Sequence, residues 1–200
     1  MGNAVKPQFS LDLSDQTALV TGTTSGLGRR FAQILAACGA KVALAGRRTE
    51  RLDELANEIR ESGGTVLPVT LDMTNRDAIR GSVQQIVSEL GLISILVNNA
   101  GIPDAQWAIK IDDDLLDRVF DTNLIGPYVL SCEVARRLIA AKKPGRMVNI
   151  SSMAAFNTGP QSAASLYSTT KAGIARMTEA LAVEWARYHI NVNCIAPGAF

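Results

Sequence analysis

The chain has 200 residues, of which 47% are hydrophobic and 20% are charged, an ordinary balance for a globular protein with one domain. Its formal net charge of +1 gives no general attraction to polyanions, so nucleic acid is not an expected partner. The sequence has no apolar run near the roughly 18 residues that a membrane span needs, its start lacks the apolar core of a secretory signal, and it has no His/Cys cluster for a metal such as zinc. We therefore expect a cytoplasmic protein with reduced thiols at Cys38, Cys132 and Cys194.

Short apolar runs alternate with longer amphipathic stretches along the chain. In chain order, the pattern predicts a strand over 17–20, a helix over 26–38, a strand over 41–45, a helix over 50–60, a strand over 65–71, a helix ending near residue 89, a strand over 93–97, a helix over 114–141, a strand over 146–150, a helix over 166–188 and a strand over 190–195. Asn75 is the expected N-cap of the third helix. We expect Gly126-Pro127 to bend the long fourth helix.

This alternation predicts an α/β fold: a Rossmann-type, doubly wound parallel sheet in three α/β/α layers. The strands are continuously apolar, as expected where helices cover both faces of the sheet. Ligands of such sheets bind at the carboxyl ends of the strands. With no repeat or linker, we expect one NAD(P)-binding domain over 1–200, with residues 1–10 as a tail.

A glycine-rich turn, Thr21-Gly22-Thr23-Thr24-Ser25-Gly26-Leu27-Gly28, follows the first predicted strand and opens the first helix. Glycines at this point allow a tight turn and a close approach of the backbone to a pyrophosphate. The helix N-terminus adds its positive dipole end. The turn therefore predicts a dinucleotide site, and the alternative is a purely structural turn.

The end of the second predicted strand indicates which dinucleotide binds. NAD-binding sheets often place an acid here for the ribose hydroxyls, whereas this chain has Ala45-Gly46-Arg47-Arg48. Guanidinium groups suit a phosphate, so the sequence favours NADP(H), with NAD(H) also possible. The alternative is that both arginines simply form a solvated helix start.

Tyr167 and Lys171 stand four apart in the last predicted helix and share one of its faces. An ammonium group beside a phenol favours the phenolate, which makes the tyrosine usable as a proton donor or acceptor near neutral pH. Such a pair on its own is most often a helix-surface contact. Together with a dinucleotide site, it predicts a redox reaction between a carbonyl and an alcohol.

Further motifs follow the predicted strands in order: Asp72 after the third, Asn98-Asn99-Ala100-Gly101 after the fourth, Ser151-Ser152 after the fifth and Pro197-Gly198 after the sixth, with Asn123 in the long helix. With the glycine turn and the Tyr–Lys pair, this ordered set resembles the classical branch of the short-chain dehydrogenase/reductase family. Within it, the chain looks most like the 3-oxoacyl-[acyl-carrier-protein] reductase-like group. The resemblance covers the chain from about Leu11 onward.

The resemblance implies a role for each motif. Tyr167 would donate the proton to the carbonyl oxygen, Lys171 would hold the nicotinamide ribose and activate the tyrosine, and Ser152 would orient the carbonyl. Asn123 would hold a water that links Lys171 to solvent. The implied cofactor-binding residues are Gly22, Thr24, Ser25, Gly26, Leu27, Gly28, Arg47, Arg48, Asp72, Met73, Asn99, Ala100, Gly101, Tyr167, Lys171, Pro197 and Gly198.

Each polar motif also has a simpler explanation. Asn123 could cap a kinked helix by hydrogen bonding to the backbone. Asp72 could cap the following helix, and Asn98-Asn99 could form a turn. Ser151-Ser152 could end a strand without any chemical role. Only the ordered set favours the functional interpretation.

The chain departs from the family pattern in two places. Tyr167 follows Ser152 by 15 positions, which is longer than usual and indicates a small insertion within 156–165; Ser162 and Ser165 are weaker candidates for the serine role. Family members also continue beyond the equivalent of residue 200 with a substrate-covering loop, helices and a last strand. We therefore expect a longer natural chain, because the sixth strand would otherwise be an exposed apolar edge.

The sequence thus predicts an NADPH-dependent reductase of a ketone or a 3-oxoacyl thioester. The alternatives are an NAD-dependent alcohol dehydrogenase of the same family and a non-catalytic sensor or scaffold. Ala154, Phe156, Gln161 and Trp107 are candidate pocket walls, and Lys142, Lys143 and Arg187 are candidate contacts for an acyl carrier protein. The family resemblance also implies a homotetramer or homodimer packed through helix 114–141 and the helix that carries Tyr167.

Overall fold

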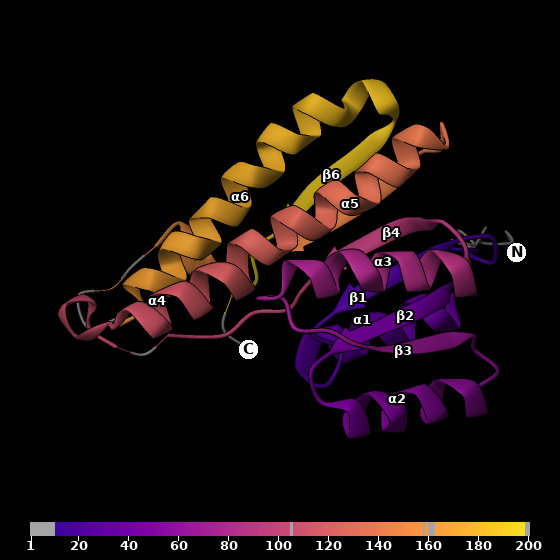
Figure 1. Ribbon diagram of the computed structural model, residues 1–200, viewed down its shortest axis with the longest axis horizontal. Helices are drawn as coiled ribbons and strands as arrows, with labels where there is room; N and C mark the ends of the chain where they lie inside the picture. Colours follow the sequence, from indigo (N-terminus) through magenta and orange to yellow (C-terminus); the bar gives the residue numbers. More distant parts are fainter. Residues whose placement is uncertain (1–10, 105, 158, 160–162, 199–200) are drawn as a thin grey trace, which may run out of the picture.

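The computed structural model describes residues 11–104, 106–157, 159 and 163–198. These residues form a six-stranded parallel sheet with the strand order β3-β2-β1-β4-β5-β6 (Figure 1). Order and direction confirm the predicted doubly wound α/β fold. The sheet order reverses between β1 and β4, so ligand binding is expected at the carboxyl ends of these two strands.

The strands are short and mostly buried. Their bounds are β1 Thr17–Thr21, β2 Lys41–Gly46, β3 Val66–Thr70, β4 Ile93–Asn98, β5 Gly145–Ile150 and β6 Ile190–Ile195. At the centre, Leu19 pairs with Ala43 on one side and Leu96 on the other, and all three side chains are buried. Because both faces are covered, the sequence shows continuous apolar runs in place of alternation.

Helices cover the two faces of the sheet. They are α1 Gly26–Ala37, α2 Thr49–Glu61, α3 Arg76–Leu90, α4 Asp113–Phe120, α5 Gly126–Ala140 and α6 Ser165–Trp185. The helices α1 and α2 pack on one face with a core that includes Val20 and Leu55, and α3, α5 and α6 pack on the other with Leu19, Leu130 and Ile174. In Figure 1, β3 lies beside α2 at one end of the sheet, and β6 lies beside α6 at the other.

The cap predicted for α3 is confirmed. The Asn75 side chain accepts hydrogen bonds from the backbone N–H groups of Asp77 (3.1 Å) and Ala78 (2.9 Å). These are donors that the first turn of a helix cannot satisfy internally.

The prediction of one long helix over 114–141 is wrong in its middle. A π-helical turn, Asp121–Ile125, separates α4 from α5. Pro127 has no N–H to donate to the carbonyl of Asn123, so the regular helical pattern fails one turn before the proline. Gly126 lets this region pack tightly, because a Cβ there would lie 2.5 Å from the carbonyl oxygen of Met73.

The predicted helical segment over 166–188 is confirmed, although its last turn is of another helix type. The α-helix stops at Trp185, and a 3-10 turn over Ala186–Tyr188 leads into β6. His189 follows in the left-handed conformation, with φ of 58°. The 3-10 turn is tighter than an α-helical turn and ends the helical segment before the chain enters β6.

The face that carries α1 has an apolar groove at the β6 end of the sheet. It has a volume of about 190 Å³ and is lined by Phe31, Ile34, Leu35, Val97, Val148, Ile150 and Ile195. Among the residues that the structure describes, β6 pairs only with β5. No helix among the described residues is long and apolar enough to cross a membrane.

Candidate active site

The glycine turn packs directly against the loop that follows β4. Gly22 has a φ of +71°, and a Cβ on it would lie 2.9 Å from both Ala100 Cα and Asn99 Nδ2. A Cβ on Gly28 would lie 2.3 Å from the Gly22 carbonyl oxygen. Glycine is therefore required at both positions for helix α1, the turn and the Asn99 loop to meet.

A cleft of about 270 Å³ opens at this contact, at the carboxyl ends of β1, β2, β3 and β4. Its lining residues come from the four strand ends and from the π-helical turn: Thr21, Gly22, Thr24, Ser25, Ala45, Gly46, Arg47, Arg48, Leu71, Asp72, Met73, Asn99, Ala100, Gly101, Ile102 and Thr122. The glycine cradle and the N-terminus of α1 fit a pyrophosphate, since both present backbone N–H groups without side chains in the way. The cleft therefore suits a dinucleotide.

The two arginines lie at the end of the cleft formed by β2. Arg48 Nε donates to the hydroxyl of Thr24 (3.1 Å), and its Nη2 donates to Thr24 and to Ser25 (3.2 Å). Arg48 is thereby held against the glycine turn, and Arg47 and Arg48 both line the cleft and are exposed. Because both also stand at the start of α2, the alternative of a solvated helix start stays open, and binding of a phosphate by the arginines stays a prediction.

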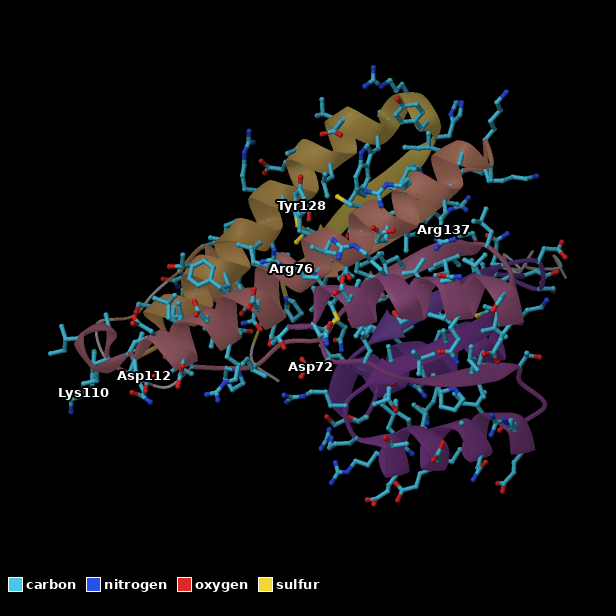
Figure 2. The ribbon with its side chains drawn as sticks, in the orientation of Figure 1. Asp72, Arg76, Lys110, Asp112, Tyr128 and Arg137 are labelled. Atoms are coloured by element: carbon cyan, nitrogen blue, oxygen red, sulfur yellow. The ribbon has the colours of Figure 1, made fainter. Side chains whose placement is uncertain are left out.

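Asp72, labelled in Figure 2, lies just beyond the end of β3 and lines the cleft. Its Oδ1 accepts from the backbone N–H and the hydroxyl of Thr74, each at 3.0 Å. Asn75 is the residue that caps α3, so the alternative role of Asp72 as a helix cap is not what the structure shows.

A second cavity of about 290 Å³ adjoins the first and shares Asn99, Gly101 and Ile102 with it. Its other lining residues are Leu27, Pro103, Ile150, Ser151, Ser152, Tyr167, Lys171, Pro197 and Gly198. The carboxyl ends of β5 and β6 thus bring the Tyr–Lys pair and the Pro-Gly turn to one place. The sequence-predicted residues Gly26, Gly28 and Asn123 line neither cavity.

Lys171 is nearly enclosed, with 4% of its surface exposed. Its Nζ lies 5.5 Å from the centroid of the Tyr167 ring and donates to the carbonyl oxygen of Ile150 at 2.8 Å. Burial lowers the pKa of Lys171 from 10.5 to about 8, against a smaller raising effect of Cys194. The ammonium form therefore still predominates at neutral pH, close to the phenol.

The two serines at the end of β5 have different surroundings. Ser151 is buried, and its hydroxyl donates to the backbone carbonyl of Lys171 at 2.7 Å. Ser152 lines the cavity, and its Oγ accepts from the N–H of Ala154 at 3.2 Å, which leaves its O–H proton directed elsewhere. Ser152 is thus the better placed of the pair to donate to a ligand. Ser165 is exposed on the first turn of α6, and Ser162 lies outside the described residues.

Asn123 sits in the π-helical turn and is 1% exposed. Its Oδ1 accepts from Ile102 N (2.8 Å), and its Nδ2 donates to Ile102 O (2.9 Å) and to the hydroxyl of Thr170 (3.2 Å). The side chain therefore clamps a neighbouring loop and does not cap its own helix. A Cβ on Gly101 would lie 3.4 Å from both Asn123 Oδ1 and Lys171 Nζ, so these groups converge below Gly101. The water-holding role of Asn123 stays a prediction.

Several supporting residues were not found from the sequence. Thr21 lines the cleft, and its hydroxyl accepts from the N–H groups of Asn99 and Ala100, each at 3.0 Å. Thr170 and the buried carboxylate of Asp104 contact the main chain of Tyr167. A threonine directly before the first glycine was a usable signal for Thr21. Nothing in the local sequence marks the partners of Asp104.

Among the described residues, the candidate pocket walls and carrier contacts lie outside both cavities. Phe156 is 74% and Trp107 51% exposed, and neither they nor Ala154 line a cavity; Gln161 lies outside the described residues. Lys142 and Lys143 precede β5, and Arg187 precedes β6, so all three lie at the amino ends of the strands. They are therefore on the opposite edge of the sheet from the cleft.

A dinucleotide cleft that ends at a buried lysine, a tyrosine and a serine is the site of a nicotinamide-dependent oxidoreductase. Residues 16–200 match the family model described as short chain dehydrogenase. The 3-oxoacyl-[acyl-carrier-protein] reductase of Rickettsia prowazekii is 35% identical over 188 residues, which cover 94% of this chain and 74% of that protein.

Solved structures agree with this assignment. A gluconate 5-dehydrogenase from Burkholderia cenocepacia in complex with NADP and tartrate matches with a TM-score of 0.88 and 30% identity, covering 96% of this chain and 74% of that one. A metagenomic short-chain oxidoreductase in complex with NADP matches with a TM-score of 0.87 and 32% identity, covering 94% and 84%. The chain belongs to the short-chain dehydrogenase family, and the prediction of an NAD(P)-dependent oxidoreductase acting on alcohol or ketone groups is confirmed.

The buried lysine leads to a prediction about stability. With a folded pKa near 8 and an ordinary value of 10.5, the unfolded chain binds more protons than the folded chain between these pH values. The free energy of unfolding therefore rises with pH between about 8 and 10.5. Below pH 8 the whole destabilisation caused by burying the charged lysine is present. We expect the free energy of unfolding of the wild type, minus that of Lys171→Met, to increase by up to about 3 kcal/mol from pH 7 to 10.5.

Urea unfolding of both proteins at several pH values would measure this difference. The subtraction cancels those titrating groups that do not interact with Lys171. A difference that stays flat between pH 7 and 10.5 would contradict the effect of burial on Lys171.

Proposed function

We propose that the protein is an NADPH-preferring reductase that converts a ketone or a 3-oxoacyl thioester to the alcohol. The observation that carries this proposal is the continuity of the two cavities: the arginines stand at one end, and Ser152, Tyr167 and Lys171 stand at the other. The similarity to a 3-oxoacyl-[acyl-carrier-protein] reductase, and to relatives solved with NADP, supports both parts of the proposal.

The cofactor, when bound, supplies or accepts the hydride. In the direction of reduction, Ser152 donates a hydrogen bond to the carbonyl oxygen, and Tyr167 gives its phenolic proton to the same atom. The ammonium group of Lys171 lies 5.5 Å from the centroid of the Tyr167 ring. A proton then returns to Tyr167 from the side of Lys171 and Asn123, whose polar groups converge below Gly101.

Lys171 also serves this chemistry through its anchoring. Its Nζ donates to Ile150 O, and its carbonyl accepts from Ser151, so two bonds fasten it to the end of β5. Ser152 is the next residue of the same segment. Lys171 and the Ser152 hydroxyl are thereby both held at the end of β5, and catalysis by positioning depends on such fixed placement.

The first experiment follows NADPH consumption with a short 3-oxoacyl thioester and with simple ketones, with NADH in parallel. Turnover of the thioester supports the acyl substrate class, and turnover of ketones alone places the substrate among free carbonyl compounds. No turnover in either direction with either cofactor would favour the alternative of a non-catalytic NAD(P)-binding sensor or scaffold.

The Tyr167→Phe variant tests the proton donor. We expect kcat to fall roughly 10²- to 10⁴-fold, the usual worth of a general acid, while the affinity for NADPH measured by fluorescence titration stays at the wild-type value. Tyr188→Phe is the matched control, because Tyr188 lies in the 3-10 turn before β6 and lines neither cavity. A Tyr167→Phe enzyme with unchanged kcat would contradict the mechanism.

The double variant Arg47→Ala/Arg48→Ala tests the cofactor preference. We expect the KM for NADPH to rise at least about 10-fold and that for NADH to change little, because even one charge-assisted bond to a phosphate is worth roughly 1.5–3 kcal/mol. Arg51→Ala is the control, since Arg51 is exposed on α2 and does not line the cleft. Equal changes for both cofactors would contradict the preference for NADPH.

We also propose a homodimer or homotetramer packed through the long helices. Tyr128 on α5 (labelled in Figure 2) is 48% exposed and Val183 on α6 is 82% exposed, which leaves apolar surface on both helices. Sedimentation equilibrium is expected to give a multiple of the chain mass, and a monomer would contradict the proposal. Docking of an acyl carrier protein and a cytoplasmic location remain further parts of the proposed function.

A further inference from the structure

Asp104 holds the backbone of the tyrosine from a distant loop. It lies three residues after Gly101 and is only 6% exposed. Its Oδ2 accepts a hydrogen bond from the backbone N–H of Tyr167 at 3.0 Å, and its Oδ1 accepts from the N–H of Gln106 at 2.9 Å. No ion pair within the described ranges includes Asp104. The hydrogen-bond donors to this carboxylate are therefore the two backbone N–H groups.

The bond to Tyr167 replaces a cap that α6 lacks. The first turn of a helix has N–H groups without partners, and the N-cap residue of α6 is Ala164, whose side chain cannot accept a bond. Asp104 supplies the acceptor from 63 positions away in the sequence. A carboxylate suits this place, because the positive end of the helix dipole stabilises it and the bond is charge-assisted.

The carbonyl of Tyr167 is held as well. It accepts from the hydroxyl of Thr170 at 2.8 Å, and Thr170, fully buried, accepts from Asn123 Nδ2 at 3.2 Å. Asn123 in turn binds both backbone groups of Ile102, two residues before Asp104. The loop over 101–104 is therefore fastened to α6 on both sides of Tyr167.

We propose that Asp104 is a positioning residue for the reaction: by fixing the Tyr167 backbone against the loop over 101–104, it aims the phenol at the carbonyl held by Ser152. This inference rests on the proposed function, because it takes Tyr167 as the proton donor. Asp104 lines neither cavity and touches no reacting atom, so it acts only through Tyr167.

Asp104→Ala tests the inference by a split between kcat and KM. We expect kcat to fall about 10- to 100-fold, the order of loss that a misplacement near 1 Å produces, with the KM for NADPH unchanged. Asp104→Asn keeps one acceptor oxygen, which can serve the N–H of Tyr167 but not that of Gln106 at the same time, and is expected to restore part of the lost kcat. A fall in kcat that Asp104→Asn does not repair, or a KM that rises in parallel, would overturn the inference.

Asp112→Ala is the matched control. Asp112 is an aspartate of the same loop region, labelled at the start of α4 in Figure 2, and it caps that helix through Leu115 N at 2.8 Å. We expect it to lower the melting temperature, as loss of a helix cap does, and to keep kcat. If Asp112→Ala lowers kcat as much as Asp104→Ala, the effect comes from general loosening of the loop and the inference is wrong.

The background of Tyr167→Phe separates action through the phenol from general damage. If Asp104 acts by aiming that hydroxyl, then Asp104→Ala produces no further loss of residual turnover once the hydroxyl is gone. An equal loss in both backgrounds would show that Asp104 supports the site in some other way, and would overturn the inference.

Hydrogen exchange measured by mass spectrometry supplies a readout that needs no turnover. The peptide that contains Tyr167 is expected to exchange faster in Asp104→Ala, and at the wild-type rate in Asp112→Ala. If the wild type reduces no substrate but this difference appears, the proposed function fails while the anchoring of Tyr167 stands. If the Tyr167 peptide exchanges equally in all three proteins, the anchoring itself is refuted.

Discussion

The site depends on the contact between the carboxyl ends of β1 and β4, where the order of the sheet reverses. The hydroxyl of Thr21 receives the N–H groups of Asn99 and Ala100, and Asn99 Nδ2 donates back to the carbonyls of Thr21 and Gly22. Gly22 and Gly28 have no Cβ because the two segments leave no room for one. This single junction fixes the glycine turn, and thereby the cleft, relative to the loop that leads to the second cavity.

A buried polar network holds the other half of the molecule together. Asn98 Nδ2 donates to Ser131 on α5 (2.9 Å) and to Asn149 on β5 (2.8 Å), and Asn149 Nδ2 donates to Thr178 on α6 (2.9 Å). Such bonds are strong inside a dry core but costly if unmade, and Asn98 Oδ1 has no partner among the described residues. The network therefore favours one alignment of α5 and α6 on the sheet, which an apolar core of the same volume would fix less narrowly.

The sequence predicted the elements and the order of the motifs well, because both are written in local patterns. Strand apolarity, the cap at Asn75 and the spacing of Tyr167 and Lys171 each involve residues within a few positions of one another. The π-helical turn before Pro127 was missed, since a proline after a glycine signals a bend without indicating which helical turn absorbs it. Asp104 was missed for a different reason: its partner is a backbone N–H 63 positions away, and only the path of the loop brings them together.

The choice between Ser151 and Ser152 shows the same limit. Both follow β5, and their position in the sequence favoured Ser152 only by resemblance. The structure separates them physically, because Ser151 gives its proton to Lys171 O and Ser152 faces the cavity. Lys142 and Arg187 were likewise candidate contacts for an acyl carrier protein. In a parallel sheet, residues that directly precede a strand lie at the edge opposite the carboxyl ends, and so these two lie away from the cleft.

The loop over 99–104 joins these observations into one device. Asn99, Gly101 and Ile102 line both cavities, Ile102 is clamped by Asn123, and Asp104 binds the backbone of Tyr167. A ligand that presses on this loop from the first cavity therefore acts on the same few residues that hold the proton donor of the second. On the opposite side, Ser151 donates to the carbonyl of Lys171 at the end of β5. The alignment of the phenol with a carbonyl is consequently set by the position of the loop, and the part of the chain that receives the dinucleotide is also the part that aims the tyrosine.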